Sequence, residues 1–79
     1  MHYRKLRNEM TEDALAVELA LRNYVHMTID EIATVCSMRT TAVMFIIEQM
    51  MIYQVTMRYP DGGYRLTDEY MTSLRLRAA

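Results

Sequence analysis

The fold of this chain is decided by the stretch from Met27 to Val55, MTIDEIATVCSMRTTAVMFIIEQMMIYQV. Near its start, the Thr28 hydroxyl can accept a hydrogen bond from the backbone of Glu31, and the Glu31 carboxylate can reach back to the Thr28 N–H. This arrangement is a capping box, so a helix is predicted to begin here. Its apolar residues recur at one-turn spacing on a single face, at Ile29, Ile32 and Ala33.

A second, longer helix is predicted from Thr40 to Tyr53. Cys36 and Met38 supply apolar groups where the chain turns over the same core. Arg39 stands where a capping Ser or Thr is usual, so we expect Ser37 or Thr40 to provide the cap. The pattern indicates two helices joined by a short turn.

This pattern resembles the winged helix-turn-helix superfamily of small DNA-binding regulators, over the region from Ala14 to Tyr70. The motif of that superfamily is matched by Ile32, Ala33, Met38, Thr40, Thr41, Val43 and Met50. The stretch Gly63–Glu69, GYRLTDE, resembles the returning wing strand and the next helix. The resemblance implies a mainly α fold with a small β-hairpin, made of a three-helix core, a wing and a C-terminal helix.

Two glycines that are common in the superfamily are replaced here. Ser37 occupies the turn between the two helices, and Gln54 follows the second helix. Polar residues reach the left-handed conformation at modest cost, or a slightly different turn avoids it. Neither replacement therefore excludes the fold.

The remaining elements are predicted from caps and from alternation of apolar residues. They are a first helix from Thr11 to Tyr24, a short strand at Val25–Met27, wing strands at Val55–Tyr59 and Tyr64–Leu66, and a last helix at Asp68–Leu76 capped by Thr67. The apolar stripe of the first helix is Ala14, Val17, Leu21 and Tyr24. We expect residues 1–10 to be a mobile basic N-terminal arm, and residues 11–79 to be one winged-helix domain.

A turn at residues 60–63 predicts a register that sets Arg58 opposite Arg65. Like charges placed opposite each other destabilise a β-ladder by up to about 1 kcal/mol, and a DNA phosphate between them would remove that cost. Alternatively, both guanidinium groups extend into water or pair with Asp61 and Asp68. The same register turns Met57 toward the core, with Leu66.

Size and composition restrict the function classes. A chain of 79 residues forms one small domain with no room for a deep substrate cavity. Its hydrophobic content of 52% exceeds what one small core hides, which favours a partner or a second copy. No apolar run approaches membrane-spanning length, so we expect a cytoplasmic protein without a membrane contact. Nine basic and ten acidic residues predict weak nonspecific DNA binding.

Residues for catalysis or for metal binding are not evident in the sequence. The single cysteine, Cys36, suits a small buried hydrophobe between two helices, and His2 and His26 are isolated from it. The chain also lacks a glycine-rich phosphate loop, a nucleophile elbow and an acid/base pair. We therefore expect neither an enzyme nor a cofactor.

The resemblance assigns DNA contacts to five residues on the second helix and the wing: Arg39, Thr40, Thr41, Arg58 and Arg65. The second helix is unusually apolar, and its expected core face is Val43, Ile46, Ile47 and Met50. Three further apolar residues remain outside that face, at Met44, Phe45 and Met51. Either they pack under the wing or against the first helix, or they form an adaptable surface that docks another protein.

Two hypotheses follow. The first is a small winged-helix regulator of transcription that binds double-stranded DNA, acting as a homodimer through its first and last helices. The alternative is a winged-helix protein-interaction module, encoded by a phage or a mobile element, that binds or inhibits a host protein. The basic residues of the helix and wing favour the first, and the apolar second helix favours the alternative.

Overall fold

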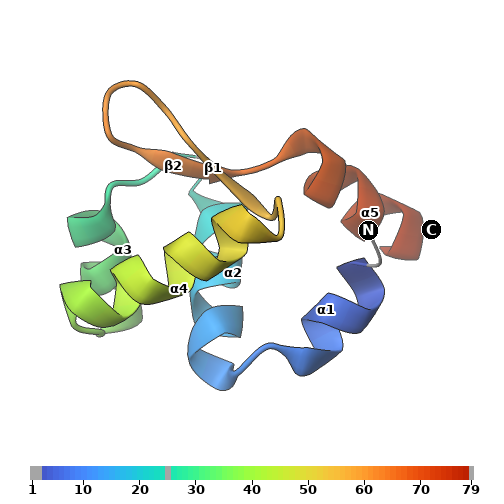
Figure 1. Ribbon diagram of the computed structural model, residues 1–79, viewed down its shortest axis with the longest axis horizontal. Coiled ribbons are helices and arrows are strands. Elements are labelled where there is room, and N and C mark those ends of the chain that lie inside the picture. Colours follow the sequence, from blue (N-terminus) through green and yellow to red (C-terminus); the bar gives the residue numbers. More distant parts are fainter. Residues whose placement is uncertain (1–2, 25, 79) are drawn as a thin grey trace.

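The computed structural model describes residues 3–24 and 26–78, and its elements are helices and one two-stranded hairpin. In chain order the elements are α1 (Tyr3–Glu9), α2 (Glu12–Asn23), α3 (Ile29–Cys36), α4 (Thr40–Ile52), β1 (Thr56–Arg58), β2 (Tyr64–Leu66) and α5 (Asp68–Ala78). Helices α2, α3 and α4 meet beneath the hairpin, and α1 and α5 lie together at the opposite side (Figure 1). The expected mainly α fold with a small wing is confirmed.

Three helices begin at threonine caps, as predicted. Thr11 Oγ1 accepts from the backbone N–H of Ala14 at 3.1 Å, and Thr67 Oγ1 accepts from that of Tyr70 at 3.1 Å. Thr28 forms the complete capping box with Glu31. Helix α4 differs, because Arg39 is its N-cap residue and no side chain caps its first amides. The expected cap from Ser37 or Thr40 is therefore wrong.

Helices α3 and α4 both end in a left-handed residue that is not glycine. Ser37 has φ 54° and Gln54 has φ 60°. At each end a six-residue backbone hydrogen bond closes the turn, from Met38 N to Ala33 O at 2.9 Å and from Val55 N to Met50 O at 2.8 Å. These are Schellman motifs, so the geometry usually supplied by glycine is retained without it.

The core lies between α2, α3, α4 and the wing. Its buried apolar residues include Val17, Leu21, Ile32, Val43, Ile47, Met50, Val55, Leu66 and Tyr70. Of the predicted face of α4, Ile46 is only half-buried. Tyr24 does not join the stripe of α2, since 55% of its surface is exposed. The reason is that α2 ends at Asn23 and Tyr24 is already extended, at φ −123° and ψ 96°.

The register of the wing differs by one residue from the prediction. Arg58 is opposite Tyr64, and Met57 is opposite Arg65. The cause is a loop one residue shorter than expected. Tyr59 N donates to Gly63 O at 2.8 Å, so the loop is residues 60–62, and Gly62, at φ 93°, donates to Tyr59 O at 3.0 Å and forms a bulge. The expected arginine pair is therefore wrong. Met57 is 40% exposed instead of facing the core, and the buried cross-strand pair is Thr56 and Leu66.

The third strand expected beside the wing is reduced to a single bridge. Met27 and Tyr64 exchange backbone hydrogen bonds of 3.0 and 2.7 Å. The predicted strand at Val25–Met27 also includes Val25, which lies outside the described residues. The bridge attaches the segment before α3 to the returning strand of the wing.

The expectation of a mobile N-terminal arm is wrong for the described part of residues 1–10. Residues 3–9 form α1, in which Tyr3 is buried. The Tyr3 hydroxyl donates to Gln54 O at 3.1 Å, and its ring meets that of Tyr70 edge-on with centroids 5.2 Å apart. Leu6, one turn further, also packs against the core. Helix α1 is thus held by apolar contacts on one face.

A buried carboxylate joins α1, α2 and α5. Glu18 is fully buried on α2 and accepts from Arg7 Nε at 2.7 Å and from Arg22 Nε at 2.6 Å. The Tyr70 hydroxyl donates to the same carboxylate. Burial by itself raises the pKa of Glu18, but the hydrogen bonds from Arg22 and Tyr70 and the charges of Arg22 and Arg7 outweigh it, so the pKa lies below its usual value.

Candidate nucleic-acid interface

Helices α3 and α4 have the geometry of a helix-turn-helix. The chain bends by 112° between them, within the range typical of this motif. Among the described residues, no single helix is long and apolar enough to cross a membrane, although this bent pair taken together has the length and apolarity. In Figure 1 the start of α4 and the loop of the wing both lie on the left-hand side, with α3 between them in this view.

The first turn of α4 is exposed and carries no negative charge. Arg39, Thr40 and Thr41 are all exposed, as expected for residues that contact a ligand. The helix has no acidic residue in its first turn and no side-chain cap. Because the first backbone N–H groups of a helix lack internal partners, these amides are available to an anion such as a phosphate.

The outer face of α4 is largely apolar. Four residues recur at three- or four-residue spacing opposite the buried face, at Thr41, Phe45, Glu48 and Ile52. Phe45 is 64% exposed, and Met44 and Met51 are exposed beside it. These residues are therefore not covered by the wing or by another helix. Of the two arrangements that the sequence left open, the exposed one is observed.

The two wing arginines are in different environments. Arg58 is exposed. Arg65 is half-buried and donates to Tyr59 Oη at 3.2 Å, to Leu66 O at 3.0 Å and to the carboxylate of Asp68. The hydrogen bond with Tyr59, followed by the charge of Asp68, raises the pKa of Arg65. Pairing with Asp68 agrees with the alternative that the sequence left open for this residue.

The tip of the wing is held by a histidine that sequence reasoning considered only as a metal ligand. His26 Nε2 lies 3.1 Å from Asp61 Oδ1, and the same oxygen accepts from Gly63 N at 2.9 Å. The His26 ring also meets the Tyr59 ring, with centroids 4.6 Å apart. The hydrogen bond from Gly63, and then that from His26, lower the pKa of Asp61. Asp61 is thus not a partner of either wing arginine.

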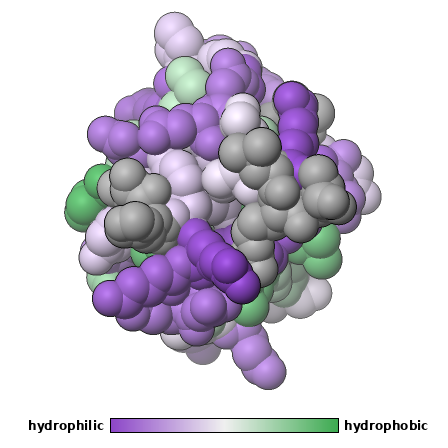
Figure 2. Space-filling model, turned by 90° about the vertical axis from the view of Figure 1, so that its right-hand side faces the viewer, coloured by the Kyte–Doolittle hydropathy of each residue, from purple (hydrophilic) through white to green (hydrophobic). Residues whose placement is uncertain are grey.

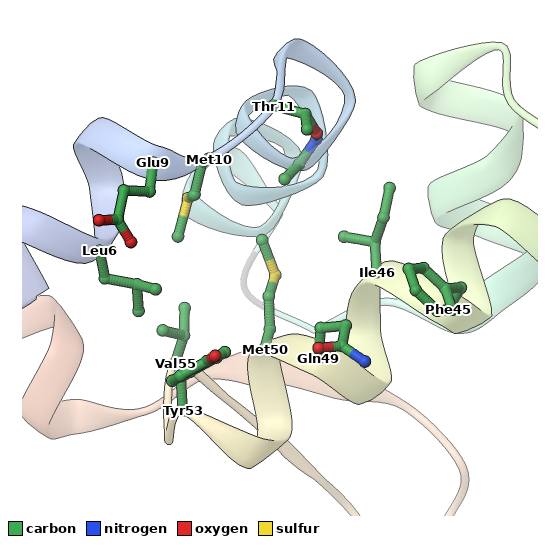
Figure 3. Close-up of a pocket in the computed structure, with 11 residues that line it drawn as sticks. Leu6, Glu9, Met10, Thr11, Phe45, Ile46, Gln49, Met50, Tyr53 and Val55 are labelled. Atoms are coloured by element: carbon green, nitrogen blue, oxygen red, sulfur yellow. The ribbon is translucent and has the colours of Figure 1, made fainter.

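An apolar groove runs between α4 and the end of α1. It has a volume of about 300 Å³, and its walls include Leu6, Met10, Phe45, Ile46, Met50 and Tyr53. Figure 3 shows Leu6 and Met10 facing Met50 across the groove, with Phe45 at its edge. Glu9 is the only charged residue of the lining.

The side of the molecule that carries α1 and α5 is mainly hydrophilic in the residues drawn in colour (Figure 2). Apolar residues are seen there mostly at the margins of the view. In the described part of the chain no three His, Cys, Asp or Glu side chains lie close enough to hold a metal ion. Cys36 is half-buried, and burial raises the pKa of its thiol.

Several solved structures have the same arrangement of helices and wing. A MarR family transcriptional regulator from Silicibacter pomeroyi DSS superposes with a TM-score of 0.79 at 17% identity, over 92% of this chain and 52% of that one. The MarR family regulator SPO1453 from Silicibacter pomeroyi DSS-3 gives 0.75 at 23% identity, over 98% and 60%. The transcriptional regulator PA4135 gives 0.75 at 13% identity, over 91% and 57%.

These comparisons establish the winged helix-turn-helix fold, as the sequence implied. The chain spans between 52% and 60% of the length of the three structures. No protein-family model and no curated relative matches the sequence.

Proposed function

We propose that this chain is a DNA-binding regulator of transcription that inserts α4 into the major groove and sets the wing against the adjacent backbone. The observation that carries the proposal is the exposed, uncapped start of α4, which a 112° bend joins to α3. In helix-turn-helix proteins the first residues of the second helix contact base edges. The three solved structures of this fold are described as transcriptional regulators, which supports the same role here.

Five residues have distinct roles in this proposal. Arg39 and the free amides of α4 bind phosphate, while Thr40 and Thr41 reach base edges. Arg58 is exposed on the wing and binds the backbone directly. Arg65 already pairs with Asp68, so it contributes to affinity only by exchanging that carboxylate for a phosphate. We therefore expect Arg58 to contribute more to affinity than Arg65 does.

We also propose that the chain acts as a homodimer in the cytoplasm. Large apolar side chains remain exposed at several positions outside the DNA-facing helix, including Leu19, Tyr24 and Val35. A second copy would cover part of this surface and would double the DNA contacts at two half-sites. Light scattering of the purified chain measures its mass in solution, and a monomer at micromolar concentration would contradict the dimer.

The test of DNA binding is fluorescence anisotropy of a labelled random-sequence duplex, titrated at about 50 and 200 mM salt. We expect affinity to fall as salt rises, and we expect Arg58→Ala to weaken binding and to reduce the salt slope by about one. Arg75→Ala removes an exposed arginine from α5, away from α4, and is the matched control. A folded protein that binds no duplex at low salt would refute the proposal.

A second candidate function is a protein-interaction module, which the exposure of Met44, Phe45 and Met51 favours. Flexible methionines beside an aromatic ring form surfaces that adapt to a partner. In that case Phe45→Ala should abolish binding of the protein partner while circular dichroism shows an unchanged fold. The anisotropy titration separates the two functions, because this module requires no affinity for DNA.

A further inference from the structure

The second turn of α4 lacks the hydrogen-bonding side chains that a recognition helix usually has there. Between Thr41 and Glu48 every residue is apolar, and the two exposed ones are Met44 and Phe45. The preceding turn is polar, with Arg39, Thr40 and Thr41. The second turn of the helix therefore presents a thioether and an aromatic ring to its ligand.

Phe45 is placed to enter the ligand and not the protein core. It lies on the outward stripe with Thr41, one turn after it, and opposite the buried Val43 and Ile47. The residue is 64% exposed, and Figure 3 shows its ring at the edge of the groove. Any duplex that contacts Thr41 must also contact Phe45, because the two side chains project from the same side of adjacent turns.

The major groove has one apolar feature that such side chains can recognise. Every base pair offers hydrogen-bond donors and acceptors there, but only thymine adds a 5-methyl group. A phenyl ring pressed against guanine, cytosine or adenine edges would leave their polar atoms without partners, which is unfavourable. When the same ring contacts a thymine methyl group, apolar surface of both the ring and the methyl group is buried.

We infer that α4 recognises its DNA through methyl groups in the major groove, with Phe45 as the specificity-determining residue and Met44 beside it. This inference rests on the proposed DNA-binding function. The sites that the protein favours then contain thymine beneath the second turn of α4. Arg39 and the first turn fix the register of the helix on the backbone, and the apolar turn selects the methyl-bearing bases.

Four labelled hairpin duplexes of about 24 base pairs test the inference, since this length accommodates two half-sites one helical turn apart. They contain alternating A·T, alternating A·U, alternating G·C, and alternating G·C with 5-methylcytosine. Uracil lacks the thymine methyl but keeps the hydrogen-bonding groups, and 5-methylcytosine adds a methyl at the same edge. We expect the wild type to prefer the methylated member of each pair by about four-fold for each methyl group it buries.

Two substitutions test whether the preference for methylated duplexes comes from the Phe45 side chain. Phe45→Ala and Phe45→Gln both remove the ring, and we expect both preferences to disappear while salt-dependent binding remains. Arg75→Ala changes an exposed side chain of α5, outside the proposed DNA surface and the apolar surface proposed for the dimer, and should leave both preferences unchanged. Helical circular dichroism confirms the fold of each variant. If one of the two Phe45 variants unfolds, the other still tests the inference.

The outcomes separate the inference from the function on which it rests. Equal affinity of the wild type for A·T and A·U duplexes, with a normal salt slope and a weaker Arg58→Ala variant, would overturn methyl recognition and leave the DNA-binding function standing. Preferences that persist in both Phe45 variants would also overturn the assignment to this residue. No binding to any of the four duplexes at low salt would refute the DNA-binding function itself.

Discussion

Replacing Glu18 with Gln is predicted to destabilise the protein by about 3 kcal/mol. Glu18 is fully buried and accepts charge-assisted hydrogen bonds from Arg7 and Arg22 and a further bond from Tyr70. Gln keeps the shape of the side chain but removes the negative charge that both guanidinium groups neutralise. The helices that this group joins, α1, α2 and α5, lose their shared polar contact.

The magnitude follows from burial and from the access of the arginines to water. Removing one partner of a buried ion pair costs about 3–5 kcal/mol, because the remaining charge is left without a partner. The side chains of Arg7 and Arg22 are 25% and 34% exposed, so each regains some hydration in the variant. We therefore expect the loss in the free energy of unfolding to lie at the lower end of this range.

Urea and thermal unfolding, followed by far-UV circular dichroism at pH 7, measure the effect. For a domain of this size, about 3 kcal/mol corresponds to a midpoint lower by about 12–24 °C. Glu9→Gln, an exposed carboxylate on α1, is the control and should change the free energy of unfolding by less than about 0.5 kcal/mol. A loss in Glu18→Gln no larger than in this control would refute the account of the buried cluster.

The pH dependence gives a second signature of the same group. The pKa of Glu18 is lower in the folded protein than in the unfolded chain. The contribution of Glu18 to the free energy of unfolding is therefore fully present above its unfolded pKa, near 4.3, and is lost as pH falls through its folded pKa. The stability difference between the wild type and Glu18→Gln should stay constant above about pH 5 and shrink in stronger acid. A difference that does not change with acid would contradict this assignment.

Three further predictions concern stability and DNA binding. Ser37→Gly and Gln54→Gly should each raise the free energy of unfolding by up to about 1 kcal/mol in thermal melts, because glycine adopts a positive φ without strain; an unchanged midpoint would contradict the left-handed geometry. Glu48→Gln removes a negative charge from the outward stripe of α4, so anisotropy should show affinity for a random duplex raised by up to about five-fold at low salt; unchanged affinity would place the residue away from DNA. Tyr70 has a pKa raised above its ordinary value, first by burial and then by its contact with Glu18. The contribution of this pKa shift to the free energy of unfolding is complete below the unfolded pKa near 10, and it is lost as pH rises through the folded pKa. The free energy of unfolding should therefore fall less steeply with pH in alkali for Tyr70→Phe than for the wild type. An equal fall in both proteins would contradict this prediction.

Local signals in the sequence predicted the starts of the helices well. Thr11, Thr28 and Thr67 each cap the helix that follows, because a hydroxyl three residues before a free amide needs no tertiary contact to act. Ser37 and Gln54 were predicted to occupy the places of glycines, and both are left-handed. These features depend on a few adjacent residues, so the sequence contains what determines them.

Features that depend on distant residues were not predictable in this way. Glu18 and Arg22 look like an ordinary exposed pair one turn apart, but Tyr70, 52 positions later, covers the carboxylate. The wing register depends on the bulge at Gly62, and a Pro-Asp-Gly-Gly turn fits two loop lengths equally well. A change of one residue in the length of the loop exchanges the two faces of the strand, which is why Met57 is exposed.

The environments of some proposed DNA-binding residues were also predictable from adjacent residues, and others were not. The exposure of Arg39, Thr40 and Thr41 follows from their place at the start of a helix after a turn. The environment of Arg65 follows only in part. Its pairing with Asp68, three residues later, was an alternative that the sequence left open, whereas its contact with Tyr59 depends on the register that the loop imposes. Their roles in binding DNA stay predictions that the titrations above test.

The junction between α4 and the wing connects the outer helices to the proposed interface. The carbonyl of Gln54 accepts from the Tyr3 hydroxyl at 3.1 Å and from Thr67 Oγ1 at 2.7 Å. Val55, the next residue, is buried, and its carbonyl accepts from Thr67 N at 2.9 Å. A left-handed residue turns its carbonyl away from the helix axis, so Gln54 offers an acceptor that a continuing helix would have used internally. Helices α1 and α5 thereby fix the point at which α4 ends and the wing begins, and with it the angle between the two surfaces that are proposed to hold DNA.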